Sequence, residues 1–176
     1  MRTLQRSFSR FDEWLQAENG PRFRGSIQLA KEGVAALSNF LETRLVLHVR
    51  TEELAQPGMV VVDAQGRRFL LAEHDRSLHT RVLKMFPVTT HASWKRETQT
   101  TDLVTGLPKG SGIQDLGLIW CAIEIYGRES VDRQTHIGTD RSRVLTGSDV
   151  QLNDLIDGRM VRRKYIVYGI LMVEIE

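Results

Sequence analysis

The dipeptide Asp157-Gly158 is the feature that most constrains what this chain can fold into. Apolar residues approach it over 150–156 and leave it over 160–175. A two-residue Asp-Gly connection suits a type I′ turn, whose backbone twist matches that of two antiparallel strands. The sequence therefore predicts a hairpin at 150–175. The second strand of this hairpin is too long and too apolar to be stable alone in water, so further strands must cover it.

Those strands are predicted upstream, where the apolar pattern has a period of two. Leu45, Leu47 and Val49 alternate with less apolar neighbours, which indicates a strand with this set buried. Turn residues at 57–58 and 63–66 predict a second hairpin, and the apolar run 116–126 predicts a strand buried on both faces. About seven or eight such strands joined by short turns predict a mainly β fold, an antiparallel β-barrel or sandwich.

The N-terminal part is predicted to be helical. Four apolar residues recur at spacings of four, three and four, as on one face of a helix that ends near 19–21: Leu4, Phe8, Phe11 and Leu15. A second short helix is predicted over 33–43. The first helix packs on its own domain in the interpretation that we favour, and docks on a neighbouring subunit in the alternative. The expected organisation is an N-terminal helical extension, 1–43, followed by a β-barrel domain, 44–176.

Residues 97–114 are predicted to form a long flexible loop. The stretch contains three glycines and one proline, with few apolar residues, so it lacks the pattern of a packed element. In a compact domain a loop of this length is usually functional or disordered. It lacks any residue set for chemistry, and assembly with other proteins is the role that fits it best, with ordering on binding.

No catalytic signature, cofactor motif or metal-ligand spacing is visible in the 176 residues, and we expect no enzyme, no cofactor and no metal. Cys121 lies in an apolar run and is predicted to be a buried, inert thiol. The net charge is only +2, which argues against general binding of nucleic acid through a strongly basic surface. No apolar run approaches the roughly 18 residues of a membrane helix, so no membrane partner is expected.

Positive charge is concentrated just after the Asp-Gly turn, on four residues: Arg159, Arg162, Arg163 and Lys164. One interpretation is an exposed strand end with solubilising charge. The alternative is a basic rim that faces phosphate or an acidic partner. In a strand, Arg163 points opposite to Arg162 and Lys164, so only part of the cluster can share one face.

Several segments resemble the small β-barrel head-closure or head-tail connector (neck) proteins of tailed bacteriophages. They are Pro57-Gly58-Met59 to Asp63 with 66–71, the strand Trp94-Lys95-Arg96, the loop 102–108 with sequence DLVTGLP, and the terminal hairpin 154–161. The resemblance covers 44–176 and rests on turn chemistry. It implies a β-barrel that assembles into a ring beneath the portal, with a loop that projects into or plugs the channel. It would assign the docking or channel role to Thr101, Asp102, Leu107 and Lys109.

The function expected from this resemblance is a structural protein of the virion neck, made in the host cytoplasm. A homo-oligomeric ring would lie between portal or adaptor and tail, and would close or gate the channel through which DNA passes without sequence-specific binding. The alternatives are a nucleic-acid-binding β-barrel module, for which Trp94 and Tyr126 are possible stacking platforms, and another tail-side protein such as a tail terminator.

Overall fold

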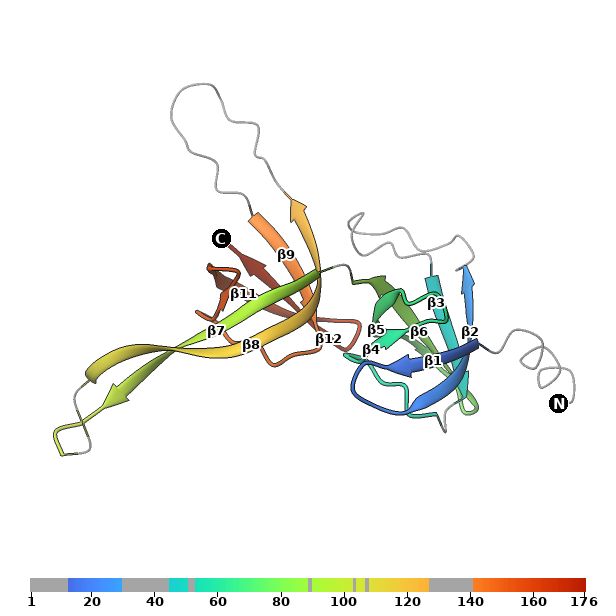
Figure 1. The fold of residues 1–176 in the computed structure, drawn as a ribbon, viewed down its shortest axis with the longest axis horizontal. Helices are drawn as coiled ribbons and strands as arrows, with labels where there is room; N and C mark the ends of the chain where they lie inside the picture. Colours follow the sequence, from blue (N-terminus) through green and yellow to red (C-terminus); the bar gives the residue numbers. More distant parts are fainter. Residues whose placement is uncertain are drawn as a thin grey trace, which may run out of the picture. The chain divides into compact units, whose positions relative to one another are not determined.

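The computed structural model describes residues 13–29, 45–50, 53–88, 90–102, 104–106, 108–126 and 141–176, and all regular elements in these ranges are β-strands. The chain divides into two compact units (Figure 1). Unit 1 comprises 1–89 together with 166–170, and unit 2 comprises 90–165 together with 171–176. The predicted mainly β class is confirmed, and each unit contains a closed six-stranded antiparallel barrel.

Unit 1 is a barrel with strand order β1-β2-β3-β6-β5-β4, in which β1 pairs with both β2 and β4 and so closes the sheet. The strands are β1 (Glu13–Ala17), β2 (Arg22–Leu29), β3 (Leu45–Arg50), β4 (Val60–Val62), β5 (Arg68–Arg76) and β6 (Thr80–Pro87). The barrel interior is filled by alternate apolar residues, among them Leu15, Phe23, Leu47, Leu71 and Met85. Leu47 and Val49 are buried as the alternation of this segment predicts.

The helix predicted through Leu15 is wrong for residues 13–17, which form β1. Leu15 and Ala17 are buried whereas Trp14 is exposed, so the local burial pattern has the period of a strand. Pairing with β2 and β4 supplies the backbone hydrogen bonds of this segment. These tertiary contacts outweigh the local helical spacing, of which Leu15 is the last member. Residues 1–12 and the short helix predicted over 33–43 lie outside the described residues.

Residues on both sides of the expected domain boundary, 43/44, belong to the same barrel. Strand β2 pairs with β3 from Ser26 opposite His48 to Leu29 opposite Leu45. In the structure the division between units falls instead after Thr89, in front of β7. A boundary of this kind depends on which strands pair across long sequence separations, and local composition carries little information about it.

Unit 2 is a barrel with strand order β10-β11-β12-β9-β8-β7, closed by pairing of β10 with β7. Its strands are β7 (Thr90–Thr101), β8 (Pro108–Tyr126), β9 (Arg141–Thr146), β10 (Leu155–Ile156), β11 (Arg159–Val167) and β12 (Ile170–Ile175). The core includes Ile119, Cys121, Val144, Val161 and Val173. The expectation that the run 116–126 is buried on both faces is wrong for its first part, because Leu118 is 68% exposed, whereas Cys121 and Ala122 farther along are buried.

The predicted Asp157-Gly158 hairpin turn is confirmed. Both residues have positive φ, 49° and 78°, as a type I′ turn requires, and they join β10 to β11. The prediction of one long strand over 160–175 is wrong, however. Tyr168 and Gly169, with φ of 51° and 73°, make another turn and divide it into β11 and β12. Residues 166–170 belong to unit 1, where the Glu73 N–H donates to the Tyr168 carbonyl at 2.6 Å.

Candidate functional site: the β7–β8 arm

Residues predicted as a flexible loop form the outer halves of β7 and β8. Glu97 lies opposite Ile113, and Gln99 lies opposite Ser111. The prediction of an irregular loop over 97–114 is therefore wrong for most of its described residues. Threonines at 98, 100 and 101 favour extended backbone, and ladder hydrogen bonds form although there is no apolar face to signal a strand.

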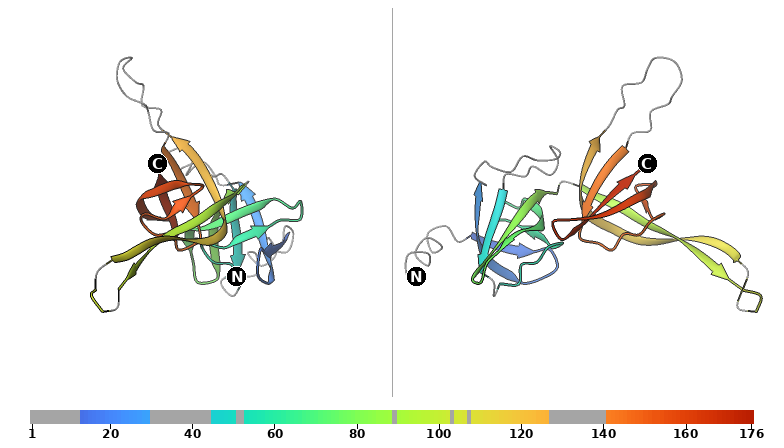
Figure 2. Two further views of the ribbon diagram at one scale, coloured as in Figure 1. Left: turned by 60° about the vertical axis from the view of Figure 1, so that its left-hand side comes forward. Right: turned by 180° about the vertical axis from the view of Figure 1, so that it is seen from behind.

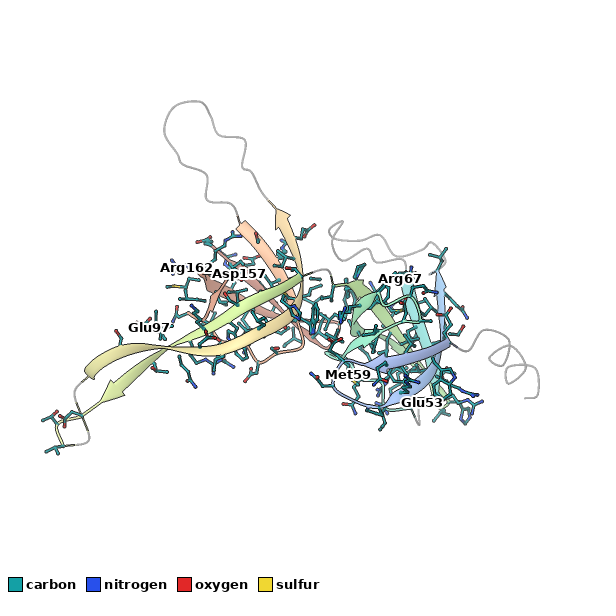
Figure 3. The ribbon with its side chains drawn as sticks, in the orientation of Figure 1. Glu53, Met59, Arg67, Glu97, Asp157 and Arg162 are labelled. Atoms are coloured by element: carbon teal, nitrogen blue, oxygen red, sulfur yellow. The ribbon has the colours of Figure 1, made fainter. Side chains whose placement is uncertain are left out.

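This two-stranded ribbon, residues 96–101 and 108–114, is called the arm below. Strand β10 pairs with β7 only at Trp94 and Lys95, and β9 pairs with β8 only from Cys121 to Tyr126. Along the arm, therefore, β7 and β8 have only each other as strand neighbours among the described residues. Figures 1 and 2 show the arm continuing well past the strands of its barrel. Glu97, labelled in Figure 3, lies on its exposed surface.

A β-bulge marks the point where the arm leaves the barrel. The register passes from Trp94 opposite Gly117 to Lys95 opposite Asp115, so Leu116 has no partner on β7. Gly117 has φ of 93°, and its N–H donates to the Asp115 carboxylate at 2.8 Å. A bulge of this kind bends the strand and increases its twist. The bulge therefore sets the direction in which the arm leaves the barrel.

The base of the arm is held by a buried carboxylate. Asp154 is 1% exposed and accepts hydrogen bonds from Arg96 Nε and Nη2 at 2.8 and 2.9 Å. It also accepts from Trp94 Nε1 and from the Gln151 N–H, both at 2.8 Å. The Arg96 guanidinium lies 5.4 Å from the Trp94 ring centroid. Two adjacent same-face residues of β7 thus converge on one acceptor from the 149–157 segment.

The two charges at this base stabilise each other's ionised form. Burial alone raises the pKa of Asp154, but the hydrogen bonds from Arg96, the Gln151 N–H and Trp94, together with the charge of Arg96, outweigh burial and lower it. The hydrogen bond to Asp154 raises the pKa of Arg96 above its ordinary value. Asp154 is therefore held as an ionised carboxylate paired with the Arg96 guanidinium.

The Asp157-Gly158 turn supports the same part of β7. The Asp157 carboxylate accepts from the Ser93 N–H at 2.7 Å and from Ser93 Oγ at 3.1 Å, and the Asp157 N–H donates to the Ser93 carbonyl at 2.9 Å. Asp157 is labelled in Figure 3. Sequence reasoning missed Trp94, Arg96 and Asp154 as a set because 58 or more residues separate the partners. The alternation of Trp94 and Arg96 was the only local signal.

The residues predicted to dock or line a channel are found along the arm and at its tip. Thr101 ends β7 and Lys109 lies in β8, whereas Leu107 lies outside the described residues. Asp102 accepts from the N–H groups of Val104 and Thr105 at 2.8 and 3.1 Å, which lowers the pKa of its carboxyl group and fixes the turn. Val104 at this tip is 93% exposed.

Each residue of the predicted basic rim has an acceptor nearby. Arg159 donates to Ser142 Oγ at 2.8 Å, and Arg162 lies 3.8 Å from Glu176. Arg163 is 3.7 Å from Glu174 and Lys164 is 3.5 Å from Asp149. Much of the positive charge on β11 is therefore matched locally. The arrangement favours the interpretation of these residues as a solvated, ion-paired strand surface.

Cys121 is fully buried, and burial is the main cause that raises the pKa of its thiol to about 11. This agrees with the predicted inert thiol. Within the described ranges, no group of three or more His, Cys, Asp or Glu residues is placed to hold a metal ion. The same ranges contain no helix with the length and apolar character needed to cross a membrane.

Comparison of the chain with protein-family models, with curated proteins and with solved structures gives no match in any of the three. The arrangement of the arm, its base and its tip therefore carries the functional argument.

Proposed function

We propose that the protein is a structural component of the neck of a tailed bacteriophage. Copies form a ring between the portal or adaptor and the tail, and the ring closes or gates the DNA channel. The observation that carries this proposal is the arm, a two-stranded ribbon that extends from a closed barrel. Within the part of the chain that the structure describes, each of its strands has only the other as a strand neighbour. The phage setting comes from the resemblance of the turn segments to neck proteins.

The composition of the arm supports pairing with another chain. Edge strands of monomeric proteins are usually protected by charged residues or proline; in the arm these lie at the ends, at Arg96, Glu97, Pro108 and Lys109, and the stretches 98–101 and 110–114 contain neither. An isolated two-stranded ribbon is at best marginally stable in water, so a further strand on either edge would stabilise it. The two barrels are closed, by pairing of β1 with β4 and of β10 with β7.

A ring satisfies both edges with one kind of contact. When copies are related by rotation about an axis that runs along their arms, the β7 edge of one copy faces the β8 edge of the next. Since β7 and β8 run in opposite directions, this contact is antiparallel, as within the hairpin itself. Repetition of such a head-to-tail contact closes a ring if the rotation allows it.

The tip suits a contact with a different neck protein. Val104 is almost completely exposed, and its backbone is fixed by the Asp102 carboxylate. Burial of this side chain in an apolar pocket of a partner would contribute about 1.5–3 kcal/mol. We assign this contact to the portal, the adaptor or the tail. The near-neutral charge of the chain suits a channel through which DNA slides without being held.

The ring is tested by analytical ultracentrifugation and negative-stain imaging of the full chain. A shortened variant, in which an Asn-Gly turn replaces 97–113, removes the arm beyond the Arg96–Gln114 pair and keeps the register of the barrel strands. We expect rings from the full chain and monomers from the shortened one. The matched control is Leu78→Ser, which changes another strongly exposed apolar residue, in unit 1, and should leave assembly intact.

The neck position is tested by adding the portal complex to the same samples. Binding should require the arm, and Val104→Ser should weaken it while ring formation persists. A full chain that remains monomeric both alone and with the portal complex would reject the proposed function. Rings that form equally well without the arm would reject the role given to the arm.

A further inference from the structure

The outer surface of β1 and β2 carries two arginines that no carboxylate of the described residues neutralises. Arg22 and Arg24 are two positions apart on β2, so they point to the same face, and both are exposed. Their partners on β1 are Gln16 and Trp14 respectively. We call these four residues the β1–β2 patch.

Arg24 is held by the aromatic ring opposite it. Its guanidinium carbon lies 4.6 Å from the centroid of Trp14, whose side chain is 54% exposed. A guanidinium stacked on an indole contacts the ring with its flat face, which leaves its in-plane N–H groups available as donors. The contact orients the cation and leaves its charge in place.

Arg22 is held in a comparable way by a neutral amide. Arg22 Nε donates to Gln16 Oε1 at 3.0 Å. The orientation of Gln16 is fixed because its Nε2 donates to the carbonyl of Ala17 at 3.1 Å and to that of Gly20. The terminal nitrogens of Arg22 remain for a ligand, and the neutral partner does not reduce its charge.

Three other arginines of unit 1 differ in this respect. Arg67 lies 2.6 Å from Asp63, Arg68 lies 3.0 Å from Glu18, and Arg81 lies 3.7 Å from Glu73. On β11, Arg162, Arg163 and Lys164 each lie within 4 Å of a carboxylate. The β1–β2 patch thus combines oriented guanidinium groups, positive charge that is not paired with a carboxylate in the described ranges, and an exposed aromatic ring.

We propose that the β1–β2 patch binds the phosphodiester backbone of DNA. Arginine donates two parallel hydrogen bonds to a phosphate, and two arginines on one strand face can contact neighbouring phosphates. Two phosphate contacts on a chain of net charge +2 make the binding weak, and contacts to the backbone make it independent of sequence, as sliding DNA requires. The site deepens the proposed function, because DNA is the molecule that passes the ring, but binding itself needs no ring.

The test is fluorescence anisotropy of a labelled DNA duplex over a salt series. Loss of one phosphate contact lowers the salt slope by about one, so the double variant Arg22→Gln/Arg24→Gln should lower it by about two and weaken binding at low salt. The matched control, Arg162→Gln/Arg163→Gln, removes the same charge from β11 and should keep the wild-type slope. Trp14→Leu should also weaken binding, because Arg24 loses the ring that orients it.

The proposal is overturned if the wild-type chain does not bind the duplex at low salt. It is also overturned if the β11 variant loses as much slope as the β1–β2 variant, since charge alone would then explain binding. Ultracentrifugation of the same variants separates the two proposals. Rings without DNA binding would refute only the patch, whereas monomers that bind DNA through Arg22 and Arg24 would support the patch and count against the ring.

Discussion

Replacing Arg96 by leucine would leave the Asp154 carboxylate buried without its cation. Removing one partner of a buried ion pair costs about 3–5 kcal/mol. Arg96 is about one-third exposed, and Asp154 keeps its hydrogen bonds from Trp94 and the Gln151 N–H. We therefore expect a loss of about 2–3 kcal/mol in the free energy of unfolding of unit 2.

The assay is urea denaturation, with hydrogen exchange of the 90–101 amides to show that the loss lies at the base of the arm. Asp154→Asn should cost a similar amount, because one amide oxygen must replace a carboxylate that accepts from three groups. The double variant should cost clearly less than the sum of the two single changes. Additive effects, or a cost of Arg96→Leu below about 0.5 kcal/mol, would refute the reasoning.

The same pair predicts a dependence of stability on pH. The pKa of Asp154 is lower in the folded protein than in the unfolded chain, so the unfolded chain binds more protons between the two values. The stabilisation is therefore fully present above the unfolded pKa, about 3.9, and is lost as the pH falls through the folded pKa. Urea midpoints measured down this range should fall in the wild-type chain, and Asp154→Asn should remove that contribution.

Three further changes test the backbone and the core. Gly25→Ala should destabilise unit 1 by about 1–3 kcal/mol, because a Cβ atom there would lie 2.5 Å from Leu47 Cδ1, and thermal unfolding measures it. Gly158→Ala should cost about 1 kcal/mol because its φ is 78° with no steric neighbour, and Gly158→Asn should cost less; equal costs would contradict this explanation. Cys121 should resist thiol reagents at about pH 8 in the folded protein and react fully in denaturant, and fast labelling of the native state would contradict its burial.

Turn chemistry and period-two alternation predicted more of the fold than composition did. Asp157-Gly158 predicted its own type I′ geometry, because both positions need positive φ and few residue pairs adopt it. Leu47 and Val49 similarly predicted their burial, since residues two apart share one face of a strand. Both features depend on residues close together in the chain, so they can be predicted without knowing which strands pair.

The sequence misled where local pattern and tertiary pairing disagree. Leu15 completes a helical spacing yet lies in β1, where β2 and β4 supply its hydrogen-bond partners. The arm lacks an apolar face, and it forms a ladder because its two strands continue a hairpin anchored in the barrel. Tyr168 adopts positive φ, which its residue type alone does not favour.

By itself the sequence determined a β protein with sharp glycine-marked turns, one buried thiol and a low net charge. The tertiary structure decided that there are two barrels, that a glycine- and threonine-rich stretch becomes an arm, and that Arg96 meets Asp154 while Arg24 meets Trp14. The physical reason is the range of the interactions. Turn geometry is fixed by neighbours in the chain, whereas the charge balance of an arginine depends on strands that only folding brings beside it.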